Sequence, residues 1–211
     1  MNIDYLRHNY SDRGLSKKEL SDNPFEQFDI WFNEAIAARI EEPNSMNLAT
    51  VSKDGQPSVR AVLLKSYDEH GFVFYTNYES RKAKNIEDNP KVALQFLWIT
   101  LGRQLRIEGK AEKISTKESK EYFKTRSRES QLGAWASAQS RIINSREDLE
   151  KELERVEQNF KDQEVILPSF WGGYRVKPIS FEFWQGRSDR LSDRVLYTQR
   201  EKIWIKNRLA P

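Results

Sequence analysis

Two very short turns restrict the fold of this chain more than any other feature of its sequence. Residues 46–52 and 58–67 are predicted to be strands, separated by an Asp-Gly dipeptide typical of two-residue hairpin loops. A second short turn at 69–71 leads into a third strand at 72–76. Parallel strands need a long crossover, whereas antiparallel strands can be joined by a tight turn. These three strands are therefore predicted to pair antiparallel.

Helices interrupt the remaining strands. Apolar residues recur at helical spacing from Phe25 to Ile40, after an Asn-Pro start that favours a helix N-terminus. Further helices are predicted at 80–89, 115–126 and 145–160, and further strands at 91–99, at 103–114 with a bulge at Gly109, and as two or three segments within 173–207. Strand clusters with segregated helices indicate an α+β fold, mainly antiparallel, with a small closed or partly closed barrel and peripheral helices. We expect one domain over residues 1–211, because no linker or low-complexity tract divides the chain.

The composition argues against several classes of function. The 211 residues include 35 basic and 32 acidic side chains. The resulting net charge of +3 is smaller than expected for a protein whose main ligand is nucleic acid. With no cysteine and two histidines, the chain cannot form a disulfide or a thiolate metal site, and we expect no metal. No apolar run reaches ~18 residues, and the N-terminus lacks the apolar stretch of a signal peptide. We therefore expect a cytoplasmic protein without a membrane or nucleic-acid partner.

The segment 181–194 concentrates several kinds of ligand-binding chemistry. It begins as an alternating strand in which Trp184 offers an aromatic plane. Arg187, Arg190 and Arg194 follow, and their planar guanidinium groups match phosphate and carboxylate oxygens. Such a segment can hold a flat, anionic molecule. The alternative, which the segment alone leaves equally open, is a barrel edge whose arginines pair with the two aspartates of the same segment.

Two other segments could also hold an anion. Arg60 and Lys65 lie at opposite ends and on opposite faces of a predicted strand, and solvated strand-end charges are the favoured interpretation of that pair. A helix is predicted to begin near Ser80 with Arg81 and Lys82 in its first turn. Cations there oppose the helix dipole at a cost of roughly 0.3 kcal/mol each, unless an anion compensates. This second segment therefore favours a phosphate site.

A third segment spaces Tyr122, Arg126 and Ser130 four residues apart. The spacing would align a phenol, a guanidinium and a hydroxyl on one helix face if the helix extends that far. Alone, such a stripe is weak evidence, because polar helix faces are usually only solvated. Together, two phosphate-binding clusters in one small protein suggest two phosphorylated molecules bound side by side.

Six segments, in order, resemble the pyridoxine/pyridoxamine 5′-phosphate oxidase family. They are R-A-V-L-L-K at 60–65, F-Y-T-N-Y-E-S-R-K at 74–82, Q-L-G-A-W-A-S-A-Q-S at 131–140, S-F-W-G-G-Y at 169–174, F-W-Q-G-R-S-D-R-L-S-D-R at 183–194 and N-R-L-A-P at 207–211. The resemblance extends from Leu6 to Pro211. It implies an FMN-binding split β-barrel that works as a homodimer, with FMN in clefts between the two subunits.

The reaction implied by this resemblance is the oxidation of pyridoxamine 5′-phosphate and pyridoxine 5′-phosphate by O₂ to pyridoxal 5′-phosphate. It would release H₂O₂ and, from the amine, NH₃, and a hydride equivalent would pass from substrate C4′ to flavin N5. The residues implied to contact FMN are Arg60, Ala61, Val62, Leu63, Leu64, Lys65, Tyr75, Thr76, Arg81, Lys82, Gln104, Gln139, Ser140, Trp184 and Arg194. Those implied to bind substrate are Arg7, Tyr10, Lys65, Tyr122, Arg126, Ser130, Arg190, Leu191 and Ser192, with Arg190 and Ser192 catalytic and residues 1–20 a flexible lid.

One position departs from the family pattern. Between Leu191 and Asp193 the family usually has a histidine, and this sequence has Ser192. A hydroxyl can donate a hydrogen bond but cannot carry a positive charge. We expect retained activity with a weaker pH dependence on the acidic side, and Arg190 as the more important residue.

Three other functions remain open from the sequence. A flavin-binding split-barrel protein could keep the FMN residues and reduce or sense another molecule. A non-catalytic carrier could bind pyridoxal 5′-phosphate and deliver it to other enzymes. Nucleic-acid binding is the least favoured, because charge is balanced along the chain. A flavin spectrum bleached anaerobically by pyridoxamine 5′-phosphate is expected only of the oxidase.

Overall fold

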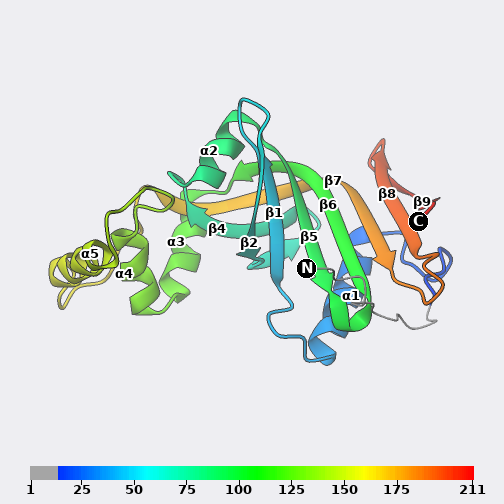
Figure 1. Ribbon diagram of the computed structural model, residues 1–211, viewed down its shortest axis with the longest axis horizontal. Coiled ribbons are helices and arrows are strands. Elements are labelled where there is room, and N and C mark those ends of the chain that lie inside the picture. The colour runs from blue at the N-terminus through cyan, green and yellow to red at the C-terminus, as the bar shows by residue number, and fades with distance from the viewer. Residues whose placement is uncertain (1–13) are drawn as a thin grey trace, which may run out of the picture.

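The computed structural model describes residues 14–211, whose strands form one nine-stranded antiparallel sheet curled into a half-barrel (Figure 1). Its order is β2-β1-β5-β6-β7-β4-β3, with β8 paired to β7 and β9 to β8. The strands are β1 (Ser45–Val51), β2 (Pro57–Leu63), β3 (Ser66–Asp68), β4 (Gly71–Asn77), β5 (Lys91–Trp98), β6 (Arg103–Lys113), β7 (Trp171–Gln185), β8 (Asp193–Arg200) and β9 (Ile203–Leu209). The helices are α1 (Pro24–Ala37), α2 (Arg81–Asp88), α3 (Thr116–Thr125), α4 (Arg128–Ala136) and α5 (Arg146–Asn159), with a 3-10 helix η1 (Ile99–Leu101). The predicted α+β, mainly antiparallel fold is confirmed.

The short turns produce the antiparallel pairs predicted from the sequence, β1 with β2 and β3 with β4. The prediction of one strand over 58–67 is wrong, because β2 ends at Leu63 and the chain then changes partners. The Leu64 N–H donates to the Asn44 carbonyl (2.9 Å), whereas the Lys65 N–H donates to the Val73 carbonyl of β4 (2.9 Å). Lys65 therefore lies at the junction of two strand pairs.

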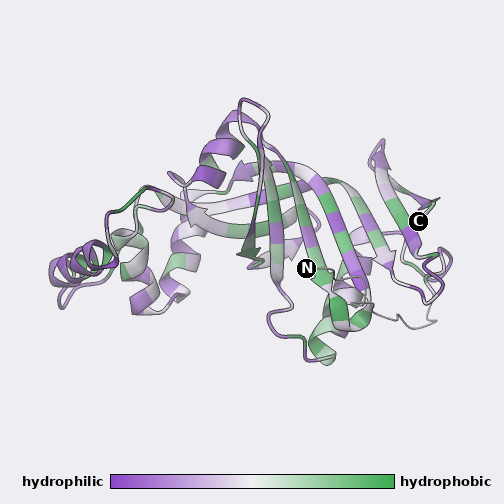
Figure 2. Ribbon diagram, viewed as in Figure 1, coloured by the Kyte–Doolittle hydropathy of each residue, from purple (hydrophilic) through white to green (hydrophobic). Residues whose placement is uncertain are grey.

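An aromatic core covers the inner face of the sheet. Phe28 and Trp31 of α1 are 0% and 2% exposed, and they pack edge-on against Phe72 and Phe183 respectively. Fully burying a large apolar side chain contributes roughly 1.5–3 kcal/mol. Hydropathy alternates along β5 and β6 (Figure 2), and apart from Arg103 their buried positions are occupied by apolar residues or glycine. Since the inner face is filled by this core, ligand chemistry must use the outer face or the ends of the sheet.

Helices α3, α4 and α5 gather at one end of the molecule, and β8 and β9 lie at the other (Figure 1). A second apolar cluster holds the three helices together. Phe123, Leu132 and Val156, one from each helix, are buried with Trp171 of β7. None of the helices between residues 14 and 211 is long and apolar enough to span a bilayer.

The helix that begins after Ser115 does not extend as far as residue 130. It ends at Thr125, and Arg126 is extended (φ −75°, ψ 150°). The Ser127 hydroxyl then caps a new helix by accepting from the Ser130 N–H (3.3 Å), so a local cap competes successfully with continuation of α3. Tyr122, Arg126 and Ser130 are therefore brought together by a bend between two helices and not by one helix face.

Candidate functional site

A cavity of about 700 Å³ opens where β2 and β4 meet α3 and α4. This volume lies in the usual range of ligand pockets, ~300–1,000 Å³. The predicted site residues that line it are Ala61, Val62, Leu63, Lys65, Tyr75, Thr76, Lys82, Tyr122, Arg126, Ser130 and Gln139. The structure thus joins three segments that the sequence offered separately.

A lysine defines one end of this cavity. The Lys82 ammonium donates to Thr76 Oγ1 (3.0 Å) and to Gln139 Oε1 (3.0 Å), which fixes its position at the cavity wall. Burial, with a smaller effect of the nearby Arg60 charge, lowers the pKa of Lys82 to about 8. An anion bound here would relieve this unfavourable environment.

The N-terminus of α2 lies beside Lys82. Its N-cap, Ser80, makes no side-chain cap, and the first turn contains Arg81 and Lys82 with no acidic residue. The free N–H groups and the helix dipole therefore face an excess of positive charge. This is the electrostatic arrangement of a phosphate site at a helix start.

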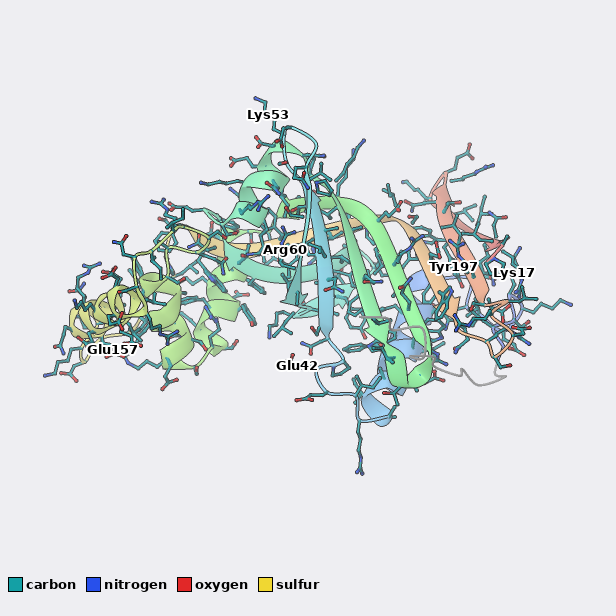
Figure 3. The ribbon with its side chains drawn as sticks, in the orientation of Figure 1. Lys17, Glu42, Lys53, Arg60, Glu157 and Tyr197 are labelled. Carbon is teal, nitrogen blue, oxygen red and sulfur yellow. The ribbon has the colours of Figure 1, made fainter. Side chains whose placement is uncertain are left out.

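Arg60 of β2 adds a further positive charge near the Lys82 end of the cavity. Its Nη1 donates to the Leu48 carbonyl (2.8 Å), Thr50 Oγ1 (2.9 Å) and the Ser58 carbonyl (3.1 Å). Burial, with a smaller contribution from Arg81, lowers the pKa of Arg60. The interpretation of Arg60 as a solvated strand-end charge is therefore wrong. Figure 3 shows it beside β1 and β2, in the middle of the molecule.

Three stacked aromatic rings form the floor toward the other end. The Tyr75 and Tyr122 rings lie 3.8 Å apart at 15°, and Trp171 stacks on Tyr75 at 5.4 Å and 11°. Burial, with smaller effects of Tyr122 and Glu118, raises the pKa of Tyr75 to about 12, so its phenol stays neutral. Trp171 belongs to a segment that the resemblance used, but no role was predicted for it. Its alignment with two tyrosines from α3 and β4 depends on tertiary packing.

Arg126 lies over this floor. Its guanidinium carbon is 4.7 Å from the Trp171 ring centre, a cation–π contact. Its Nη1 is buried and has no hydrogen-bond partner among the described residues. Burial lowers the pKa of Arg126. A buried guanidinium N–H without an acceptor is costly, and it marks a place where an anionic ligand would fit.

The remaining predicted FMN contacts form a second group on the outer face of the sheet. In the strand register Gln104 of β6 is opposite Trp184 of β7, and Trp184 is opposite Arg194 of β8. Directly opposed residues point to the same side of a sheet. These three side chains therefore form a row across three strands.

Arg194 in this row is held by a buried carboxylate. Its Nε donates to Glu182 (2.9 Å), and its Nη1 donates to the Ala210 carbonyl (2.8 Å). Glu182 also accepts from Arg106. Burial works to raise the pKa of Glu182, but hydrogen bonds and charge from the two arginines hold it below its usual value. Glu182 is thus a charged support for the row.

The row lies outside the cavity of its own chain. The cavity-lining strand β4 pairs with residues 171–176 at the start of β7, whereas Trp184 lies near the end of this 15-residue strand, opposite Gln104 and Arg194. Gln104, Trp184 and Arg194 accordingly do not line the cavity. One copy of the chain therefore presents two separate partial sites.

Residues 186–192 form a loop beside this row. Arg187 pairs with Asp193 (3.2 Å) and approaches Asp189 (4.0 Å). The alternative prediction, in which arginines of the segment 181–194 pair with its aspartates, is therefore confirmed for this arginine. It does not hold for Arg190, which is exposed and has no ion pair within residues 14–211. Arg190 also has a left-handed backbone (φ 66°), a strained conformation that often accompanies function.

The other predicted positions are distributed around these two groups. Leu191 is 65% exposed, whereas Ser192 is only 8% exposed and Leu64 belongs to the core. Ser140 follows Gln139 with a left-handed backbone (φ 71°). Arg7 and Tyr10 lie outside the described residues, as does most of the predicted lid. One domain over residues 1–211 stays a prediction.

Two family models together match most of the chain. Residues 32–160 match the family described as "Pyridoxamine 5'-phosphate oxidase". Residues 171–211 match the family described as "Pyridoxine 5'-phosphate oxidase C-terminal dimerisation region". The second match contains β7, β8 and β9, and with them Trp184 and Arg194.

Individual relatives are similar to this chain over its full length. The chain is 56% identical to a protein of Crocosphaera subtropica and 54% identical to one of Aliarcobacter butzleri, both named "Pyridoxine/pyridoxamine 5'-phosphate oxidase", with all of each chain covered. The crystal structure of PhzG from Burkholderia lata 383, in complex with tetrahydrophenazine-1-carboxylic acid, superposes with a TM-score of 0.89 at 28% identity over 95% of this chain and 99% of that one. A pyridoxamine 5′-phosphate oxidase-related, FMN binding protein of Nostoc punctiforme superposes with a TM-score of 0.71 at 18% identity over 91% and 100%. These structures confirm the split β-barrel fold.

Proposed function

This chain belongs to the pyridoxine/pyridoxamine 5′-phosphate oxidase family, and from that premise we propose that it uses FMN to oxidise pyridoxamine and pyridoxine 5′-phosphates to pyridoxal 5′-phosphate. O₂ would be the electron acceptor, with release of H₂O₂ and, from the amine, NH₃. One observation carries the proposal. A single cavity has a cationic anion site at Lys82 and another at Arg126, with an aromatic floor beside the second. This arrangement fits two phosphorylated ring compounds bound side by side.

The Lys82 end has the chemistry that the FMN phosphate needs. Arg60, Arg81 and Lys82 supply charge, and the uncapped start of α2 supplies N–H groups. Thr76 and Gln139 already contact Lys82 and can reorganise toward an added anion. We therefore assign the phosphate of FMN to this end.

The Arg126 end would hold the substrate phosphate. The orphaned Arg126 Nη1, the Tyr122 phenol and the Ser130 hydroxyl would supply donors, and Lys65 would reach both ligands from the strand junction. Trp171 fixes the guanidinium plane from below. Substrate lacking its phosphate would leave Arg126 unsatisfied and bind weakly.

A second copy of the chain would complete each cleft. The row of Gln104, Trp184 and Arg194 lies near the opposite end of β7 from its own cavity and does not line it, and two of the three residues lie in the region that matches a dimerisation family. A two-fold homodimer would place the row of each subunit, with Arg190, over the cavity of its partner. This arrangement also gives the exposed Arg190 a ligand.

When bound, FMN would accept a hydride equivalent from substrate C4′ at its N5 and pass the electrons to O₂. The protein would contribute alignment. Arg126 at the phosphate and Arg190 over the ring would hold the substrate flat, and positioning of this kind can be worth up to ~7–11 kcal/mol. Cations near the flavin would stabilise developing negative charge.

The decisive test is a spectrum of the purified protein. We expect a yellow flavoprotein that is bleached by pyridoxamine 5′-phosphate under anaerobic conditions and recovers its colour in air, with stoichiometric aldehyde and peroxide. A flavoprotein that is never bleached would support the split-barrel alternative with another substrate. Colourless protein that binds pyridoxal 5′-phosphate would support the carrier. Tetrahydrophenazine-1-carboxylic acid, the compound bound to PhzG, is a useful second substrate, and faster bleaching by it would contradict the assignment.

FMN affinity is expected to weaken as the pH rises above about 8. Lys82, with a pKa lowered to about 8, is protonated below that value, and a bound phosphate dianion favours the protonated form. Binding above pH 8 therefore requires proton uptake, and the affinity should fall by up to about tenfold per pH unit. Titration of apoprotein by quenching of FMN fluorescence measures this. Lys82→Met should remove the dependence, whereas Lys84→Met, an exposed lysine of the same helix, should retain it.

The native serine at position 192 is expected to support turnover without a strong acidic limb. Ser192→His should introduce a new dependence centred near the usual histidine pKa of about 6.5, because an imidazolium then forms beside the substrate. Turnover is measured against pH for both proteins, with Ser188→His in the same loop as the control. An inactive native chain that histidine rescues would show the expectation to be wrong.

A further inference from the structure

Three side-chain amides form a hydrogen-bonded chain that leads across the outer face of the sheet to Gln104. Asn47 Nδ2 donates to Gln95 Oε1 (3.1 Å), and Gln95 Nε2 donates to Gln104 Oε1 (2.6 Å). Asn47 of β1 is directly opposite Gln95 of β5 in the register, and Gln95 is the diagonal neighbour of Gln104 on β6. The three strands therefore carry a continuous amide relay.

The relay has a direction. Both hydrogen bonds run from an amide nitrogen to an amide oxygen in the same direction along the relay, and Gln95 takes part in both. At the end of the relay the Gln104 oxygen is occupied. Its Nε2 meets no acceptor within residues 14–211. A ligand next to Gln104 therefore meets an N–H donor.

The neighbours of Gln104 indicate what such a ligand looks like. Gln104 is opposite Trp184, which is opposite Arg194, so the row presents a donor, an aromatic plane and a cation in sequence. A flat ring system with a carbonyl oxygen at one edge matches this order. The pyrimidine end of the isoalloxazine has such oxygens, and a donor there stabilises negative charge on the reduced ring.

We propose that Gln95 is a positioning residue that fixes the amide of Gln104 with its N–H groups toward the flavin. The inference rests on the proposed function, since this row would be the partner-derived half of the FMN cleft. Without Gln95, the Gln104 amide could turn its oxygen or its nitrogen to the ring, because the two ends have nearly the same shape. If Gln95 fixes one orientation of the Gln104 amide before FMN binds, binding does not have to restrict that rotation. An aligned chain of amide hydrogen bonds also polarises and strengthens the N–H donor at its end.

The test is a double-mutant cycle on FMN binding. Gln95→Met keeps the length of the side chain and its neutrality but removes both hydrogen bonds. In the wild-type background we expect the FMN dissociation constant to rise about 3–10-fold, the equivalent of one neutral hydrogen bond. In a Gln104→Met background the same change should have less than a ~2-fold effect, because Gln95 acts only through Gln104. The flavin midpoint potential should become more negative in the wild-type background alone.

Two more variants keep the result interpretable. Gln95→Glu retains the volume but can only accept, so Gln104 would have to turn its nitrogen away from the flavin, and we expect weakening at least as large as in Gln95→Met. Gln199→Met makes the same change at an exposed position of β8 and should not alter FMN affinity. Apoprotein unfolding temperatures confirm that each variant is folded.

The outcomes separate this inference from the proposed function. Equal weakening by Gln95→Met in both backgrounds would assign Gln95 a merely structural role and overturn the inference, as would unchanged affinity in Gln95→Met with weakened affinity in Gln104→Met. Either result leaves the oxidase assignment intact. Failure of the wild-type protein to bind FMN would instead remove the proposed function, and this inference with it.

Discussion

Replacing Arg126 with methionine is expected to lower kcat/KM for pyridoxamine 5′-phosphate by about 10²–10³-fold. Truncating one member of a buried, hydrogen-bonded charge pair costs ~2–5 kcal/mol, and each 1.4 kcal/mol is about tenfold. Arg126 has a buried Nη1 without a partner and lies over Trp171, so the substrate phosphate would be its counter-charge. Steady-state kinetics measure the loss, which should be mostly in KM.

The substrate without its phosphate provides the matched comparison. Pyridoxamine should be a poor substrate of the native enzyme and should lose little more in Arg126→Met, since the interaction is then already absent. Lys124→Met, which removes an exposed lysine of α3 that pairs with Glu164, should change kcat/KM less than ~2-fold. An equal loss with both substrates would mean that Arg126 supports the fold and not the phosphate.

A mixed dimer is expected to regain activity that neither parent has. Arg190→Met should lose about 10²-fold or more in kcat/KM, because it would remove the guanidinium over the substrate ring. If each cleft takes Arg126 from one subunit and Arg190 from the other, a hybrid of the Arg126→Met and Arg190→Met chains has one cleft with both substitutions and one with neither. Isolated through two affinity tags, this hybrid should show about half of the native activity per dimer.

A cleft built from a single chain predicts a different activity for the hybrid. If both arginines served the cavity of their own chain, every cleft of the hybrid would carry one substitution, and activity would stay at the level of the parents. Methionine is suitable at position 190 because the residue is exposed, although its left-handed backbone excludes β-branched replacements. The hybrid therefore tests the shared cleft without a change in the core.

Short-range signals were sufficient for most of the fold. An Asp-Gly turn, a capped helix after Ser115 and a bulge at Gly109 each depend on neighbouring residues, and the structure has all three. Errors occurred where chain segments change partners. The end of β2 was missed because a hydrogen bond from Lys65 to β4 competes with continuation of the strand, and helix α4 was not predicted, although Ser127 caps it.

For the site, the sequence by itself determined the kinds of group and the family. Cations at a helix start, a polar stripe and an arginine-rich strand end are local features, and six ordered segments are matched to relatives by residue identity alone, without any geometry. Only the tertiary structure decided which groups meet. It brought Lys82 and Arg126 to one cavity, stacked Trp171 beneath two tyrosines, and placed Gln104, Trp184 and Arg194 near the other end of β7, outside that cavity. Those relations follow from strand order and register, which are set by long-range pairing and by the shared aromatic core, and no local pattern in the chain encodes them.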